Sequence, residues 1–446
     1  MTIYYIDGQA PTNGDGSFES PFNVSPTIAS NNTYLFASGR VLDGKGSTAI
    51  TLNPSTINVT LGCYDFETGE QLLTGPKKAI IKTESQWVIR VGTNCHNTII
   101  EMLDVIGSSG NIATCSGIYI GNSETLIANN CTVRYCIIHN VFSNDASTAT
   151  GLSYRGNYFT AHNNIIYNIG TDGVYGVGNN LKFYNNYVYN VDMNPSYGLG
   201  DCIQAIGTAT LGCSHAYIAN NVLVNPKTNK QCIILQDTTR ASIGGIIENN
   251  FCKMPPDTGI SNVIFVETTG AVVRKNNISG GSYGIFVAGP DILIAHNVIQ
   301  STEQGIAQET GITGIKVINN TIKGNSNKGI NTSTDTTAII YNNLLINCAI
   351  GLTKHGDAVE DYNAFWGCET NKSNAGGTPV WGSNTFTENP FVSDKFFLFE
   401  NSPLIHAGLY YTNSVDMLKN TVHNPPSIGA YEFVPERPEA TVRGVR

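Results

Sequence analysis

The chain has 446 residues, a formal net charge of −9 and only 13% charged residues. The negative charge argues against a nucleic-acid partner, because phosphate binding needs clustered Lys and Arg. No run of 18 or more apolar residues is present, which excludes a membrane-spanning helix. The 46 glycines and the many Asn, Thr, Ile and Val residues favour turns and strands. We therefore expect an all-β protein.

Residues 1–85 carry no clear repeat, and we expect them to form an N-terminal cap and the first coils of a repetitive fold. The opening MTIYYIDGQAPTNGDG has neither the basic region nor the apolar region that is typical of a secretory signal. We therefore expect no signal peptide in this sequence.

Residues 86–366 repeat one pattern, in which an apolar run is followed by an Asn pair or its substitute and by a second apolar run. LKFYNNYVYN, AYIANNVLVN and IKVINNTIKG are examples. The second Asn of each pair is predicted at Asn164, Asn186, Asn221, Asn250, Asn277, Asn297, Asn320 and Asn343, with Cys136 and Asn363 as flanking members. When equal positions stack about 4.8 Å apart, such Asn side chains can form a hydrogen-bonded ladder, so we interpret the pairs as structural.

A second unit alternates with the first, as in SGIYIG, DGVYGVG and YGIFVAG. Period-2 alternation predicts that the residue after the small one points inward, which applies to Ile118, Leu152, Val174, Ile203, Ile233, Ile264, Ile285, Ile306 and Ile330. No segment has helical apolar spacing, so each turn of the repeat consists of strands alone. The sequence therefore predicts a solenoid, a parallel β-helix.

The repeat ends near residue 366. We expect residues 367–433 to form an irregular capping segment, because an open sheet edge is a template for unwanted pairing, and residues 434–446 to form a flexible tail. The eleven cysteines show neither paired nor metal-ligand spacing, and we interpret them as reduced core residues.

Together these features resemble the pectate-lyase-like superfamily of right-handed parallel β-helix proteins, which includes secreted polysaccharide-degrading enzymes and bacteriophage tailspikes. The opening YYIDGQAPTNGDGSFESPF and the ending SPLIHAGLYY with PPSIGAYEF carry this resemblance beside the repeat. The resemblance implies a polysaccharide partner and an extracellular or virion-associated location, and it allows a homotrimer.

A narrower similarity is to polygalacturonases, which carry N-T-D-G and then D-D-C on adjacent coils. Thr171-Asp172-Gly173 and Gly200-Asp201-Cys202 occupy matching positions here. Gly200 replaces the first Asp of the second motif, Lys230-Gln231-Cys232 stands in place of the G-H-G stretch, and no R-I-K motif follows. These departures put the general acid and the substrate-binding cation of that family in question.

Stacking places Asp172 and Asp201 one coil apart, so the two carboxylates should repel and one pKa should rise. Split carboxylate pKa values suit glycosidic cleavage, in which one group donates a proton and the other activates water or attacks. Each Asp also stands at a strand start, where a turn role is the alternative. The insertion at residues 192–200 supports a site beside Asp201, and Glu267 is a further candidate acid.

Several side chains on the same strands should point outward and bind sugar rings. The candidates are Tyr119, Arg155, Tyr175, Gln204, Gln236, Phe265 and Phe286. Aromatic faces along a groove suit the apolar C–H faces of sugars, although loops could instead cover them.

Three functions stay open: a glycoside hydrolase acting on a capsule, O-antigen or uronate polymer, a polysaccharide lyase, and a non-catalytic carbohydrate-binding adhesin or virion protein. Hydrolysis needs no metal or cofactor, whereas a lyase could use Ca²⁺. The dispersed histidines favour turn roles over metal binding, so no metal site is predicted.

Overall fold

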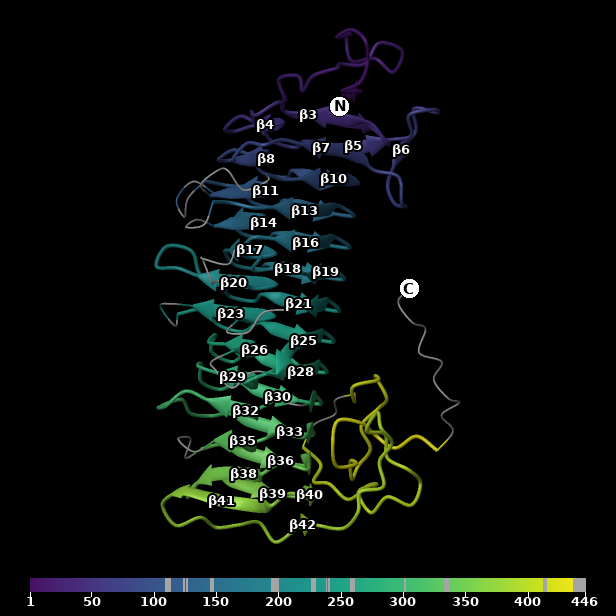
Figure 1. The fold of residues 1–446 in the computed structure, drawn as a ribbon. Coiled ribbons are helices and arrows are strands. Elements are labelled where there is room, and N and C mark those ends of the chain that lie inside the picture. The colour runs from purple at the N-terminus through teal and green to yellow at the C-terminus, as the bar shows by residue number, and fades with distance from the viewer. Residues whose placement is uncertain are drawn as a thin grey trace.

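The computed structural model describes residues 1–108, 114–122, 125, 127–144, 148–193, 200–225, 230–237, 239, 241–256, 261–300, 302–332, 337–411 and 415–435. Within these ranges the chain forms 42 strands and no helix. These residues therefore include no helix that could cross a membrane. The strands wind into coils that stack as one column from the N-terminal end to the last coil (Figure 1). The chain has the right-handed parallel β-helix fold that its repeats predict.

Three sheets run along the column, and all strand pairings are parallel except that between β5 and β6 in the first sheet. The first sheet contains β1 (Ile3–Ile6), β2 (Thr33–Ala37), β5 (Thr60–Tyr64), β6 (Gln71–Leu72), β9 (Ile99–Glu101), β12 (Thr132–Arg134), β15 (Thr160–His162), β18 (Lys182–Tyr184), β21 (Tyr217–Ala219), β24 (Ile246–Glu248), β27 (Val272–Arg274), β30 (Leu293–Ala295), β33 (Lys316–Ile318), β36 (Ile339–Tyr341) and β39 (Val359–Asp361). The second sheet contains β3 (Val41–Asp43), β7 (Ala79–Lys82), β10 (Leu103–Ile106), β13 (Ile137–Val141), β16 (Ile165–Ile169), β19 (Tyr187–Tyr189), β22 (Val222–Val224), β25 (Phe251–Pro256), β28 (Asn277–Gly281), β31 (Val298–Gln300), β34 (Thr321–Lys323), β37 (Leu344–Ile346), β40 (Asn363–Trp366) and β42 (Thr385–Phe386). The third sheet contains β4 (Ile50–Leu52), β8 (Trp87–Val91), β11 (Cys115–Ile120), β14 (Ala149–Arg155), β17 (Val174–Val177), β20 (Ile203–Gly207), β23 (Ile233–Asp237), β26 (Asn262–Val266), β29 (Tyr283–Val287), β32 (Gln304–Gln308), β35 (Lys328–Thr332), β38 (Ile350–His355) and β41 (Thr370–Gly376).

The core is a stack of aliphatic side chains inside the coils. The nine residues predicted to point inward are all at most 1% exposed: Ile118, Leu152, Val174, Ile203, Ile233, Ile264, Ile285, Ile306 and Ile330. They lie opposite one another in the register of the third sheet, so the alternation prediction is confirmed. All eleven cysteines are free and ten are buried, as expected for reduced core residues, whereas Cys368 is only partly buried.

An asparagine ladder runs along one corner of the column. The side-chain Nδ2 of each member donates to Oδ1 of the next at 2.9–3.0 Å, and the same Oδ1 accepts the backbone N–H of the previous member. The members are Asn164, Asn186, Asn221, Asn250, Asn276, Asn297, Asn320, Asn343 and Asn363. Cys136 donates its backbone N–H to the first of them, as its flanking position predicts.

One ladder position was predicted wrongly, because the ladder residue in the segment Lys275-Asn276-Asn277 is Asn276 and not Asn277. The residue before each ladder Asn has a positive φ, such as 55° at Asn249 and 59° at Lys275. Asn adopts this left-handed conformation more readily than most residues, which explains the usual pairs. Here Lys275 takes the corner, and Asn277 begins β28.

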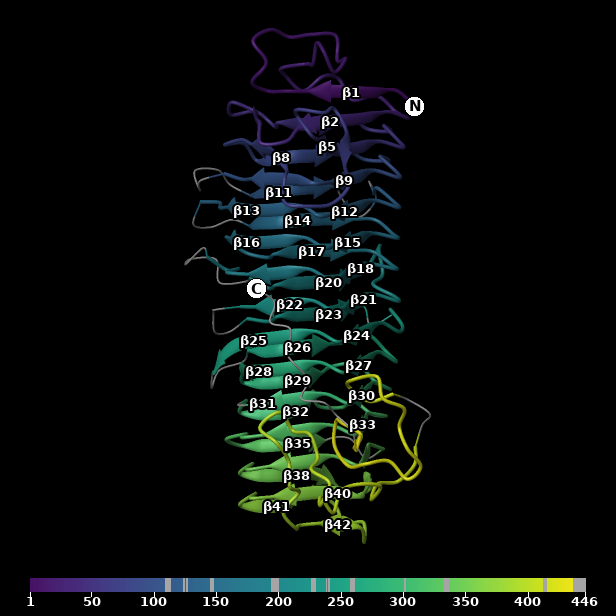
Figure 2. The same cartoon turned by 90° about the vertical axis from the view of Figure 1, so that its right-hand side faces the viewer.

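The two ends of the column are closed differently. Residues 7–30 cover the N-terminal end (Figure 2). At the other end, Lys372 follows Leu352 in an inward row and pairs with the buried carboxylate of Glu360 at 2.8 Å. A charged pair in place of aliphatic residues ends the core and discourages addition of a further coil.

Residues 387–411 and 415–435 do not lie beneath the last coil. They pack against the outer side of the second sheet (Figure 2). Phe396, Leu404 and Ile428 form one buried cluster there with Val298 and Leu344. Paired strands extend from Ile3 to Phe386, beyond both ends of the predicted repeat region 86–366. Residues 436–446 of the predicted tail lie outside the described residues.

Candidate active site on the third sheet

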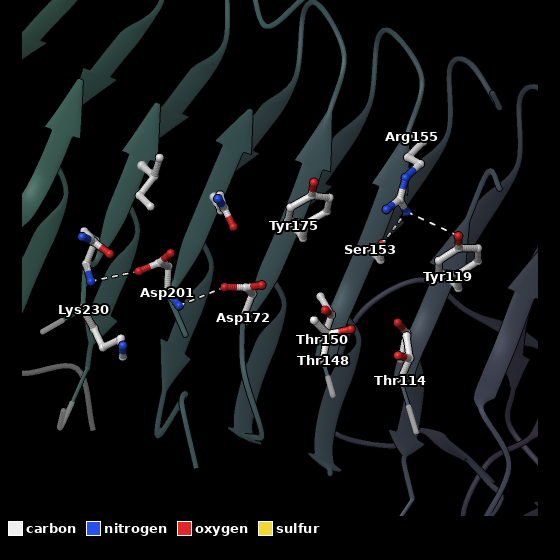
Figure 3. Close-up of a pocket in the computed structure, with 14 residues that line it drawn as sticks. Thr114, Tyr119, Thr148, Thr150, Ser153, Arg155, Asp172, Tyr175, Asp201 and Lys230 are labelled. Atoms are coloured by element: carbon white, nitrogen blue, oxygen red, sulfur yellow. Dashed lines mark hydrogen bonds between the residues drawn. The ribbon is translucent and has the colours of Figure 1, made fainter. Parts of the chain in front are cut away.

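A pocket of about 600 Å³ opens on the outer face of the third sheet, over β11, β14, β17, β20 and β23 (Figure 3). Its lining residues are Thr114, Ser116, Tyr119, Thr148, Thr150, Ser153, Arg155, Asp172, Tyr175, Asp201, Gln204, Lys230, Gln231 and Ile234. Coils stacked in register produce this pocket, because side chains far apart in the sequence become neighbours about 4.8 Å apart.

Two outward columns form the wall of the pocket. The first contains the residue two positions before each inward aliphatic residue, namely Ser116, Thr150, Asp172, Asp201 and Gln231. The second contains the residue directly after it, namely Tyr119, Ser153, Tyr175, Gln204 and Ile234. Alternation accounts for the second column, whereas the first departs from it, because a residue two positions before an inward residue would otherwise share its face.

Asp172 and Asp201 lie on adjacent coils and are both buried, at 6% and 5% exposure. Oδ1 of Asp172 accepts the backbone N–H of Asp201 at 3.0 Å, and Oδ1 of Asp201 accepts that of Gln231 at 2.9 Å. Each Asp therefore uses Oδ1 to join consecutive coils.

Both carboxylates favour the protonated form. Burial raises the pKa of Asp172 to about 7, and the nearby charge of Asp192 acts in the same direction. Burial and the charge of Asp172 raise the pKa of Asp201 well above its usual range. The Lys230 ammonium and the backbone hydrogen bonds oppose these shifts without cancelling them. The expected rise of one pKa in the pair is therefore present at both residues.

A cation and two aromatic rings form the opposite side of the pocket. The Arg155 guanidinium lies 5.6 Å from the ring centroid of Tyr119 and 5.4 Å from that of Tyr175. It donates to the Tyr119 hydroxyl at 3.4 Å and to Ser153 Oγ at 3.3 Å (Figure 3). A cation held between rings offers both charge and flat apolar surface to a ligand.

The structure brings six of the predicted site residues together and leaves four outside the pocket. Tyr119, Arg155, Asp172, Tyr175, Asp201 and Gln204 line the pocket, whereas Gln236, Phe265, Glu267 and Phe286 do not.

The four outside residues still lie on the same face of the third sheet. Phe265 and Phe286 continue the second outward column and stack at 6.0 Å with 10° between their planes. Glu267 follows β26, two coils beyond Asp201, and is buried. Residues 194–199 of the predicted insertion lie outside the described residues.

Sequence reasoning missed the hydroxyl-bearing part of the site. Ser116 and Thr150 occupy the same column as the two Asp residues, together with the amide of Gln231. Strict alternation hides this column, because a residue two positions before an inward residue is expected to share its face.

No metal centre is evident in the part of the chain that the structure describes, since no three His, Cys, Asp or Glu side chains lie together in a way that could hold an ion. This bears on the family whose model matches residues 214–429, which is described as "Periplasmic copper-binding protein (NosD)". The described residues do not fit a bound copper ion, and the matched segment excludes Asp172 and Asp201.

Comparison with known proteins finds similarity in fold. No curated protein matches the sequence. Among solved structures, XylC in complex with xylose has a TM-score of 0.55 at 10% identity, covering 97% of this chain and 99% of that one. The PL6 family alginate lyase AlyGC has a TM-score of 0.54 at 13% identity, covering 97% of this chain and 59% of that one.

The alginate lyase AlyF-OU02 in complex with G6 has a TM-score of 0.50 at 14% identity, covering 91% of each chain. Identities this low establish architecture but not chemistry. The chain thus shares the right-handed parallel β-helix fold with these proteins.

Proposed function

We propose that the protein cleaves a polysaccharide at the third-sheet pocket as a glycoside hydrolase. The observation that carries this proposal is the pair of buried carboxylates, Asp172 and Asp201, on adjacent coils in the wall of a pocket that also presents aromatic rings. Glycosidic cleavage requires one carboxyl group that is protonated and one that is ionised near the working pH.

Asp201 is the proposed general acid. Its carboxyl holds its proton while Asp172 is ionised, because burial and the charge of Asp172 raise the pKa of Asp201. It donates this proton to the glycosidic oxygen as the bond to the leaving sugar breaks. Asp172, whose pKa is about 7, is ionised in a large fraction of molecules at neutral pH, and it activates water or attacks the anomeric carbon.

The proposed substrate is a polymer that contains uronate or other acidic sugars. Arg155 offers a guanidinium that can pair with a sugar carboxylate, and Lys230 adds a second positive charge beside the acids. Tyr119 and Tyr175 can pack against sugar rings. Titles of solved structures with the same fold name alginate and xylose, which supports carbohydrate as the class of ligand.

A second candidate is a lyase acting at the same pocket. Lys230 lies close enough to Asp172 and Asp201 to lower the pKa of both, and a basic group placed there could remove the proton next to a uronate carboxylate. Two of the similar solved structures are titled alginate lyases. Either reaction fits a location outside the cytoplasm, a proposal that the periplasmic description of the matched family supports.

The test is incubation of the protein with alginate, polygalacturonate, xylan and a set of bacterial capsules. New reducing ends without unsaturated uronates identify a hydrolase, whereas ultraviolet absorbance from unsaturated uronates identifies a lyase. Asp172→Asn and Asp201→Asn should each abolish cleavage. The matched control is Asp104→Asn, which changes a carboxylate on the second sheet that contacts His139 at 2.9 Å.

Two outcomes would contradict the proposal. Cleavage that survives in both site variants would place the chemistry elsewhere. Binding of a polymer without any cleavage would identify a carbohydrate-binding protein, the remaining alternative.

A further inference from the structure

A second pocket, of about 330 Å³, lies where the C-terminal segment meets the second sheet. It is at least four coils farther along the column than Asp201, and it opens on a different sheet. Lys323, Asn347 and Trp366 line it from the coils, and Phe391, Asp394 and Phe399 line it from the segment. The proposed catalytic residues take no part in it.

The coil side of this pocket is one outward row. Lys323, Ile346 and Trp366 end the strands β34, β37 and β40 and lie opposite one another in register. The neighbouring residues Leu344 and Ala364 are buried under the C-terminal segment. Trp366 is 39% exposed, so the segment covers this sheet but leaves part of this residue open to solvent.

The segment side is a short hairpin with fixed backbone contacts. Val392 and Leu398 form an antiparallel bridge, and the N–H of Phe399 donates to the carbonyl oxygen of Phe391 at 2.8 Å. Asn389 Oδ1 accepts the N–H of Phe391 at 2.9 Å. These contacts hold two rings at the pocket that are 40% and 52% exposed, for Phe391 and Phe399.

Three exposed aromatic residues in one concave site are costly in water unless a ligand covers them. Polar groups stand among them: the Lys323 ammonium, whose Nζ lies 5.3 Å from the ring centroid of Phe396, the Asn347 amide and the Asp394 carboxylate. Flat apolar faces combined with hydrogen-bond donors and acceptors match a sugar ring, which has C–H faces and a rim of hydroxyl groups.

We propose that this pocket is a second, non-catalytic binding site for saccharide units of a polymer. The ligand stacks on Trp366 and Phe399, while its hydroxyl groups contact Asn347 and Asp394. Binding here does not depend on cleavage at the third-sheet pocket, although a polymer held at this site would stay close to that pocket.

The test uses Trp366 as the reporter. The chain has three tryptophans, so the double variant Trp87→Phe/Trp381→Phe leaves Trp366 as the only one. Its fluorescence is followed during titration with oligosaccharides of alginate, polygalacturonate and xylan. We expect a saturable change with at least one of them, and at least a tenfold weaker response when Phe399→Ala is added.

Tyr158→Ala is the matched control, because Tyr158 is an aromatic residue that is 60% exposed and lines neither pocket. This change should leave the titration unaltered. Thermal unfolding of each variant shows whether a lost response reflects a misfolded segment, and Asn347→Ala tests the same site without altering an aromatic ring.

If the fluorescence of Trp366 does not change with any oligosaccharide, the inference is wrong, even if a polymer is cleaved. A response that persists unchanged in Phe399→Ala and Asn347→Ala would overturn it too. If the emission instead depends on protein concentration alone, the pocket is a contact between copies of the chain and the inference is wrong. A response without any cleavage would support this site and count against the proposed hydrolase.

Discussion

Replacing Asp172 by Asn should make the protein more stable at alkaline pH while abolishing cleavage. Burial raises the pKa of Asp172 from the ordinary 3.8 to about 7, so between these values the folded chain binds more protons than the unfolded chain. The stabilising effect of the protonated carboxyl is complete below 3.8 and is lost as pH rises through about 7.

The magnitude follows from the same two values. At about 1.4 kcal/mol per pH unit, the difference corresponds to about 4 kcal/mol of unfolding free energy lost in the alkaline range. An Asn side chain carries no charge. Its Oδ1 can still accept the backbone N–H of Asp201, whose nitrogen lies 3.0 Å from Asp172 Oδ1 in the wild type. The variant therefore avoids this loss of unfolding free energy and keeps the hydrogen bond between the two coils.

Urea unfolding of the wild type and of Asp172→Asn at about pH 4 and about pH 8 measures the effect, with the largest difference expected at the higher pH. Asp104→Asn is the control, since it removes a contact with His139 and should not stabilise the protein. Equal stability of Asp172→Asn and the wild type at the higher pH would refute the reasoning, because the ionised carboxylate would then not be destabilising in the fold.

Three further predictions concern the ladder and the pocket. Asn250→Ala removes the hydrogen bond to the Ile218 carbonyl and the acceptor of the Asn221 backbone N–H and of one Asn221 Nδ2 hydrogen, which should cost about 3 kcal/mol in urea unfolding. A cost below that of the control Asn249→Gly would contradict the ladder. Tyr175→Ala should raise KM about five- to tenfold with little change in kcat, whereas an unchanged KM would show that the ring does not contact substrate. Lys230→Gln removes a charge that lowers the pKa of both acids, so the acidic limb of the pH–rate profile should move to higher pH, and Lys230→Arg should not move it.

The sequence repeats predict the fold well because burial imposes an inward aliphatic residue at the same position of every coil. Ile118 and Ile264 lie inside as expected, since any shift by one residue would expose them. The position of the ladder Asn was ambiguous only in the segment where Lys275 replaces the usual first Asn of the pair. Two adjacent Asn residues follow Lys275, and either could be the ladder residue. The left-handed φ of Lys275 is a property of the backbone and is not visible in the residue types.

The sequence predicts which side chains share the outer face of the third sheet, but not which part of that face forms the pocket. Stacking predicts that Asp172 and Asp201 become neighbours, and they do. The same alternation points Phe265 outward, yet which part of a long face is concave depends on the loops between strands. The aromatic pocket at Trp366 could not be predicted, because the C-terminal segment has no repeat and its place on the second sheet comes from tertiary packing.

The asparagine ladder also makes the coils interchangeable. Each rung offers the same amide donor on one side and the same carbonyl acceptor on the other, and the final amide, at Asn363, donates to Glu360 at 3.1 Å. A whole coil between two rungs could therefore be lost or duplicated without leaving a mismatched partner. A chain built this way can change the length of its outer faces in steps of about 4.8 Å while the coils that carry Asp172 and Asp201 stay unaltered.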